Sequence, residues 1–127
     1  MDPLIQNILT AEGLSAEQYY IAVLDGSSCP TTKDFLKQIA IIFKFPSYFG
    51  QNLNALNDCL SDLEWLDKPN YLLIIDNSKE FLKNEPGGIR DHIFNFLERI
   101  AREWAAVPNY EGEDSFRKKA DFRIKII

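Results

Sequence analysis

The chain has 127 residues, of which 46% are hydrophobic, and it is long enough to form one domain with a sizeable core. At that hydrophobic content a formal net charge of −5 excludes disorder, and it argues against nucleic acid as a direct partner, because phosphate binding needs clustered Lys and Arg. Two cysteines, Cys29 and Cys59, are too few for a disulfide framework. The acidic N-terminus does not resemble a signal peptide, and no apolar run reaches the roughly 18 residues of a membrane span. We expect a cytoplasmic protein with reduced thiols and no membrane contact.

The first elements along the chain are a short helix and a strand. Apolar residues recur at helical spacing over residues 3–12, and Gly13 follows them as a helix-ending residue. Residues 19–25 are rich in aromatic and β-branched side chains and stop at Gly26, which indicates a strand.

Two further helices are predicted before the next strand. Thr31 and Asp34 have the spacing of a capping box, with Asp in the place of Glu, and apolar residues then recur at helical spacing. Pro46 ends this helix, because proline disfavours helical backbone in the residue before it. The next helix carries a leucine stripe at steps of three, four and three, formed by Leu53, Leu56, Leu60 and Leu63.

The second half of the chain predicts strand, helix, strand. Residues 71–76 form a near-continuous apolar run, as a strand buried on both faces would be. A polar segment, 78–88, precedes a long amphipathic helix over 89–104, and a polar loop, 107–120, leads to a closing strand at 122–127. Strands that alternate with helices imply crossover connections, so we expect an α/β fold with a small three-stranded parallel sheet and three to four helices.

Enzyme chemistry has few candidates in this sequence. His92, the only histidine, could pair with Cys59 as a nucleophilic dyad, although a thiol beside the leucine stripe is more typical of an inert core residue. Asp76 ends a predicted parallel strand, where α/β enzymes often place function, but an aspartate there is also a common turn residue. Gly87 and Gly88 precede a helix without a Walker lysine or a dinucleotide fingerprint, and Cys and His show no metal-ligand spacing. We predict neither catalysis nor a cofactor.

One helix face stands out by its charge. Between residues 45 and 67 the sequence has no Lys or Arg, and the face opposite the leucines carries Gln51, Asn54, Asp58, Ser61 and Asp62. Asp58 and Asp62 lie four residues apart, where surface helices more often place a Glu–Lys pair. An ordinary solvated face explains this pattern, and so does a binding face for a partner rich in Arg and Lys.

The same segment resembles the signature of the barstar family, the intracellular inhibitors of barnase-type bacterial ribonucleases. The stretch FPSYFGQNLNALNDCLSDL, 45–63, follows the family pattern in register at Pro46, Tyr48, Phe49, Gly50, Asn52, Leu53, Asn54, Ala55, Leu56, Asp58 and Leu60. The likeness extends more loosely over 19–127. It therefore implies a barstar-like domain at 19–127, with residues 1–18 as a helical extension.

The resemblance implies inhibition by occlusion of a ribonuclease active site. Asp58 matches the aspartate that occupies a phosphate subsite, and Tyr48 matches an aromatic residue that packs on the enzyme. Gly50 and Asn52 would shape the loop before the helix. The implied partner is a basic protein, a ribonuclease or related toxin, and the expected partner-binding residues are Tyr48, Gly50, Asn52, Asn54, Asn57, Asp58, Ser61 and Asp62.

Several positions depart from the family pattern. Asn54 replaces an aspartate, Asn57 stands where barstar has a tryptophan, and Ser61 stands where it has a threonine. An acidic contact on the third helix of the family maps either to Glu98 or to Arg99. With these changes we still expect a protein that plugs a basic cleft. The expectation that barnase itself is the target is weaker.

Two alternatives stay open. The protein could be a non-inhibitory binding module that uses the same acidic face for another basic partner, or a small enzyme built around Asp76 and His92. The plug hypothesis requires that Asp58 and Tyr48 be exposed on one face with the leucines buried, and an Asp58 that is buried and paired within the chain would contradict it. The extension 1–18 and the loop 107–120 are each either a second contact surface or decoration.

Overall fold

The structure is a computed structural model, and it describes residues 2–127. Within them the chain forms four α-helices and three strands, in the order α1 (Pro3–Glu12), β1 (Tyr19–Asp25), α2 (Thr32–Ile42), α3 (Leu53–Leu60), β2 (Asn70–Asp76), α4 (Ile89–Ala105) and β3 (Phe122–Ile126). Two short 3-10 helices, η1 (Gly26–Ser28) and η2 (Glu113–Ser115), lie in the connections.

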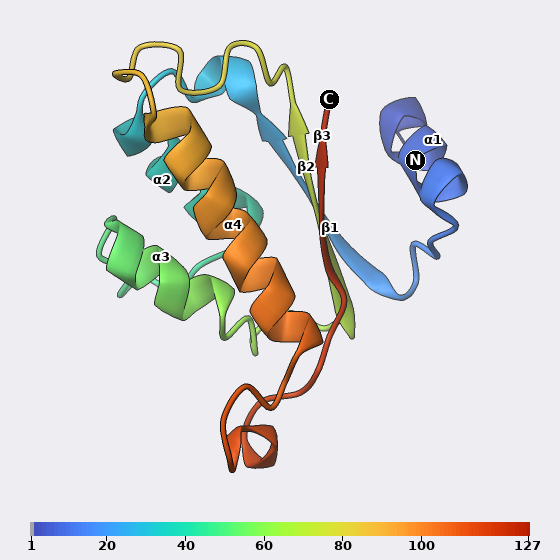
Figure 1. Ribbon diagram of the computed structural model, residues 1–127. Helices are drawn as coiled ribbons and strands as arrows, with labels where there is room; N and C mark the ends of the chain where they lie inside the picture. Colours follow the sequence, from blue (N-terminus) through green and yellow to red (C-terminus); the bar gives the residue numbers. More distant parts are fainter. Residues whose placement is uncertain (1) are drawn as a thin grey trace.

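The three strands form one parallel sheet in the order β1-β2-β3 (Figure 1). The central strand, β2, is buried from Tyr71 to Ile75, which explains its near-continuous apolar sequence. The predicted α/β arrangement of a three-stranded parallel sheet with helices is confirmed.

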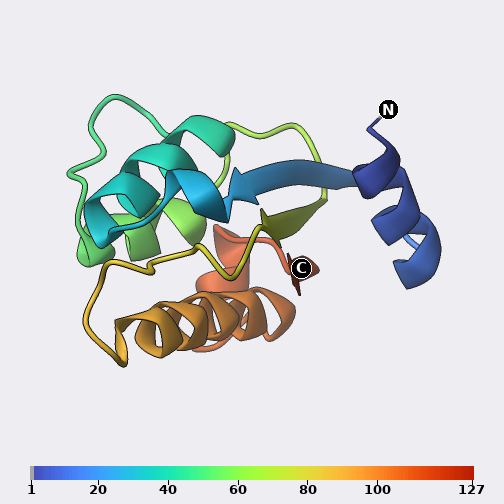
Figure 2. The same cartoon turned by 90° about the horizontal axis from the view of Figure 1, so that it is seen from above.

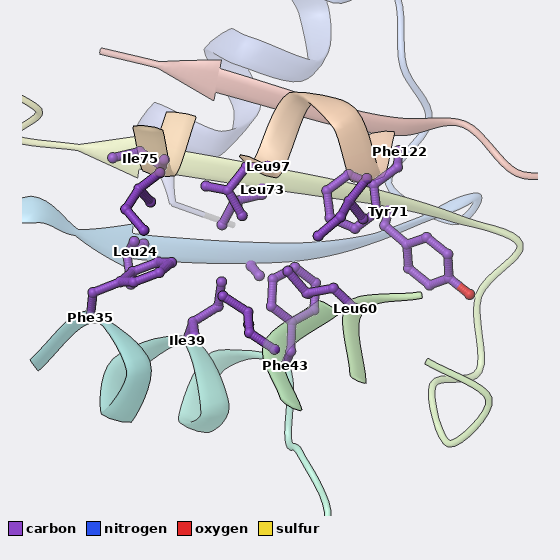
Figure 3. Close-up of a cluster of buried hydrophobic side chains, with 14 of the residues drawn as sticks. Leu24, Phe35, Ile39, Phe43, Leu60, Tyr71, Leu73, Ile75, Leu97 and Phe122 are labelled. Carbon is purple, nitrogen blue, oxygen red and sulfur yellow. The ribbon is translucent and has the colours of Figure 1, made fainter. Parts of the chain in front are cut away.

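The main core lies between the sheet and the helices α2, α3 and α4, which cover one face of it (Figure 1). Side chains from all three strands meet side chains from the three helices there (Figure 3), including Leu24, Phe35, Ile39, Phe43, Leu60, Tyr71, Leu73, Ile75, Leu97 and Phe122. The amphipathic spacing of the helices therefore has a direct cause, since each turns its apolar stripe toward this face.

Helix α1 lies on the opposite face of the sheet (Figures 1 and 2). Ile8 and Leu9 are buried there against Tyr19, Leu72 and Ile74. Glu12, in its last turn, contacts Lys125 Nζ at 3.2 Å and Arg123 Nη1 at 3.7 Å. Much of the positive charge near the C-terminus is thus paired within the protein and does not form a free basic patch.

Three local features differ from the pattern in the sequence. The segment 78–88, polar on average, buries Phe81 and Leu82 in the main core. Helix α3 ends at Leu60, and Leu63 is buried after it with a positive φ of 53°. At the start of α2, Thr31 Oγ1 accepts from the Asp34 backbone N–H at 3.2 Å, but the Asp34 carboxylate accepts from the Thr31 hydroxyl, so the capping box forms only in part.

Over residues 2–127, no helix has both the length and the apolar character needed to cross a membrane.

Candidate partner-binding surface

Helix α3 is fixed at its N-terminus by Asn52. The Asn52 side chain accepts a hydrogen bond from the Ala55 backbone N–H at 2.8 Å, which is the bond of an N-cap residue, and donates to the Gly50 carbonyl at 3.3 Å. Leu56 and Leu60 are completely buried and hold one side of the helix against the core. The orientation of α3 is therefore set, and its other side faces solvent.

Asp58 lies on that solvent side and is exposed. Among residues 2–127 its carboxylate has neither a hydrogen-bond donor nor an ion-pair partner, which is the condition that the plug hypothesis required. Asn54 and Asp62 are also exposed, and Asp62 accepts one bond, from the Glu64 backbone N–H at 3.3 Å. The exposed side of α3 and the turn after it thus offer two carboxylates and an amide, without cations from residues 45–67.

Tyr48 is 65% exposed in the loop before α3. It borders a shallow hollow of about 300 Å³, here called the Tyr48 pocket, which is lined by Tyr48, Phe49, Ala55, Asp58, Cys59 and Asp62. Ala55 and Asp58 line it because their spacing of three residues puts them on one side of α3, and Asp62 joins them from the turn that follows the helix. That spacing could have pointed to Ala55, which the sequence reasoning did not select.

Aromatic contacts hold the loop in place. The Phe49 ring packs edge-on against Phe45 with centroids 4.9 Å apart, and Phe45 packs against Trp65 at 6.1 Å. Trp65 in turn donates its indole N–H to the Phe43 carbonyl at 2.9 Å. A loop fixed in this way loses little conformational freedom on binding, which favours affinity.

A cation from α4 does approach the helix. Arg99 Nη2 lies 3.5 Å from Asn57 Oδ1, and Arg99 also pairs with Glu103 at 2.9 Å. The expectation of a face without counter-charge therefore holds for α3 itself and not for its surroundings. Asn57 and Ser61 are half-buried, whereas Glu98 is exposed and has no ion pair within residues 2–127.

The residues considered for catalysis are not brought together in the Tyr48 pocket, which Cys59 lines without His92 or Asp76. Burial, followed by the carboxylates of Asp58 and Asp62, raises the pKa of the Cys59 thiol, whereas a nucleophilic cysteine needs a lowered pKa. His92 is exposed on α4, and the Asp76 carboxylate accepts from the Asn77 backbone N–H at 2.8 Å, as a turn residue does. Gly88 serves as the N-cap of α4 with a φ of 96°. Within residues 2–127 no group of three or more His, Cys, Asp or Glu side chains could hold a metal ion.

The fold and this surface define a small α/β domain that exposes the Asp58 carboxylate on α3 together with the loop before that helix. The chain belongs to the barstar family, because the family model described as Barstar (barnase inhibitor) matches residues 19–125. No curated protein matches the chain. The matched region begins at the first residue of β1, so α1 lies outside it. At the level of the family, the members are inhibitors with a ribonuclease as protein partner.

Proposed function

We propose that the protein inhibits a ribonuclease, or a related basic toxin, by placing α3 and the loop before it in the cationic active-site cleft of that enzyme. The observation that carries this proposal is the Asp58 carboxylate, which is exposed and without a partner among residues 2–127. It is held on a helix whose opposite side is buried, so it can enter a cleft without reorganisation.

Most of the candidate residues have a role in this proposal. Asp58 takes the place of a substrate phosphate and meets the Arg, Lys and His side chains that bind it. Tyr48 packs against the cleft wall, while Asn54 on α3 and Asp62 in the turn after α3 contact the enzyme beside it. Gly50 and Asn52 shape the loop, since the Gly50 carbonyl accepts from the Asn52 side chain.

The neutral residues of α3 tune the target specificity. Asn54 and Asn57 carry amides where the family pattern has an acid and where barstar has a large aromatic anchor. Arg99 adds positive charge beside Asn57. A surface with one central carboxylate and a flanking cation suits a target whose cleft differs from that of barnase, so the cognate enzyme is a barnase-type ribonuclease with altered contacts or a related toxin.

The charge of the whole protein assists the encounter. A net charge of −5 attracts a basic enzyme, so the association rate should fall as salt rises. Such an inhibitor acts as an immunity protein in the cytoplasm, where it protects the producing cell until the toxin is exported.

The proposal is tested by titrating the protein against a barnase-type ribonuclease on a fluorogenic RNA substrate. Asp58→Ala should weaken inhibition by at least about thirtyfold, because removal of one partner from a desolvated charge pair costs about 2 kcal/mol or more. Asp67→Ala is the matched control, since Asp67 is exposed and does not line the Tyr48 pocket, and it should change inhibition by less than about fivefold.

The outcomes separate the two functions that the surface supports. Inhibition that depends on Asp58 supports the plug. Binding of the ribonuclease with full activity retained would instead favour a non-inhibitory binding module, which the lost charge at Asn54 and the lost aromatic anchor at Asn57 also fit. Equal inhibition by the parent and Asp58→Ala would contradict the role given to α3.

A further inference from the structure

The loop from Val107 to Ala120 is long and polar in sequence, yet it is firmly anchored. Glu113 is only 3% exposed, pairs with Arg117 at 3.0 Å and accepts from the Asn109 backbone N–H at 2.6 Å. The Arg117 guanidinium lies over the Trp104 ring, 4.2 Å from its centroid. These contacts fix the loop to the end of α4, so its outer side chains are held in defined positions.

Two of those outer side chains are large aromatics left in solvent. Phe116 is 71% exposed and Tyr110 is 58% exposed, and their ring centroids are 6.4 Å apart. Neither ring is buried in the core, so the stability of the fold does not explain why these two positions are aromatic. Rigidly presented aromatic side chains are enriched where proteins bind one another.

The loop also forms one wall of a second hollow. This hollow of about 630 Å³, here called the Trp104 pocket, lies between the end of α3 and the loop and is lined in part by Asp62, Glu64, Trp104 and Phe116. Asp62 lines the Tyr48 pocket as well. The two pockets therefore adjoin, and Figure 1 shows the loop with η2 just beyond the C-terminal end of α3.

The charged side chains that line the Trp104 pocket differ in whether they have partners within the protein. Arg117 is paired with Glu113, and Lys118 Nζ donates to the Lys68 carbonyl at 2.8 Å. Asp62 and Glu64 are exposed and have no ion pair among residues 2–127. Arg117 and Lys118 also line the pocket, and Arg117 Nε and Nη2 are buried without a hydrogen-bond partner, so two acidic and two basic side chains surround it beside the exposed Phe116 ring.

We propose that loop 107–120 is a second contact element for the same basic ribonuclease partner. Phe116 and Tyr110 pack on the rim of the enzyme's cleft, and a Lys or Arg side chain of that rim reaches the exposed carboxylates of Asp62 and Glu64 beside Phe116. This inference rests on the proposed function and extends its interface beyond α3 and the preceding loop.

The test measures binding of a barnase-type ribonuclease by surface plasmon resonance for the parent, Asp58→Ala, Phe116→Ala and Tyr110→Ala. Phe116→Ala should weaken the affinity by at least about tenfold, mainly through faster dissociation, as truncation of an aromatic anchor does. Ile41→Ala is the matched control, because Ile41 is 66% exposed and lines neither pocket, and it should change affinity by less than about twofold. Amide hydrogen exchange provides the second measurement, with slower exchange expected over 110–117 in the complex.

The failure of this inference is distinct from failure of the proposed function. If Asp58→Ala loses binding while Phe116→Ala and Tyr110→Ala bind like the parent, and exchange over 110–117 is unchanged, the loop is not a contact element and the plug stands. If the parent does not bind the ribonuclease, the proposed function fails and this inference fails with it.

Discussion

Two carboxylates of this protein have opposite surroundings. Asp58 is exposed and has no partner within residues 2–127, whereas Glu113 is the charged side chain that those residues bury. The Asp58 carboxylate is free to bind another molecule, whereas the Glu113 carboxylate is hydrogen-bonded and ion-paired within its own loop. Exposure and pairing, which residue type alone does not reveal, therefore separate a candidate binding group from a structural one.

Glu113 gives a pH-dependent prediction. The hydrogen bond from the Asn109 backbone N–H lowers the pKa of Glu113 below its ordinary 4.5, opposed by burial and reinforced by Arg117. A lowered folded-state pKa contributes stability above the unfolded-state pKa, and this stability is lost as the pH falls through the folded-state value. The parent should therefore be more stable than Glu113→Gln at neutral pH, and the difference should shrink below about pH 4.5. Urea unfolding of both proteins at a series of pH values measures it, and a difference that persists unchanged into acid would contradict the assignment.

At the scale of the element, α3 combines folding and recognition in one short helix. Its buried leucines orient it, and its N-cap residue, Asn52, is also a candidate contact residue. The cap explains the asparagine without any partner, since its side chain satisfies a helix N–H that would otherwise lack an acceptor.

Asn52→Ala should lower the free energy of unfolding by about 1 kcal/mol, the usual cost of losing an N-cap. Asn52→Asp should retain the stability, because aspartate caps equally well. Asn54→Ala serves as control, since Asn54 is exposed on the same helix and should change stability by less than about 0.5 kcal/mol. Chemical denaturation of the three variants decides between the roles, and an unchanged stability of Asn52→Ala would assign Asn52 to the interface alone.

Strong local patterns predicted the elements well. The apolar run of β2 and the stripes of α2, α3 and α4 encode burial directly, so the parallel sheet and its main helix layer could be read from the sequence. The burial of Phe81 and Leu82 was not predicted, because two apolar residues in a polar segment show neither a helical nor a strand period. The contact between Arg99 and Asn57 was not predicted for another reason, since it joins residues far apart in the chain and leaves no local signal.

At the scale of the whole molecule, the sheet separates two surfaces. Helix α1 covers one face, while α2, α3 and α4 cover the other, so the candidate surface on α3 lies away from α1 (Figure 2). A parallel sheet is stable only when both faces are covered, which gives α1 a structural role. That residues 1–18 are an extension of a barstar-like domain at 19–127 stays a prediction.

This separation predicts that stability and inhibition can be changed independently. Ile8→Ala should destabilise the protein by about 2 kcal/mol, because it leaves a cavity against Leu72 and Ile74. Its inhibition of a ribonuclease should stay unchanged at a temperature where the variant is folded. Thermal unfolding and the inhibition assay test both parts, with Gln6→Ala, on the exposed side of α1, as the control. A loss of inhibition in folded Ile8→Ala would mean that α1 communicates with the candidate surface.

The most direct test of the central claim is whether the protein and RNA compete for the ribonuclease. If α3 occupies the phosphate-binding cleft, RNA and inhibitor exclude each other, and the apparent inhibition constant should rise in proportion to substrate concentration above KM. An inhibition constant that is independent of substrate concentration would place the protein outside the active site and contradict the plug mechanism.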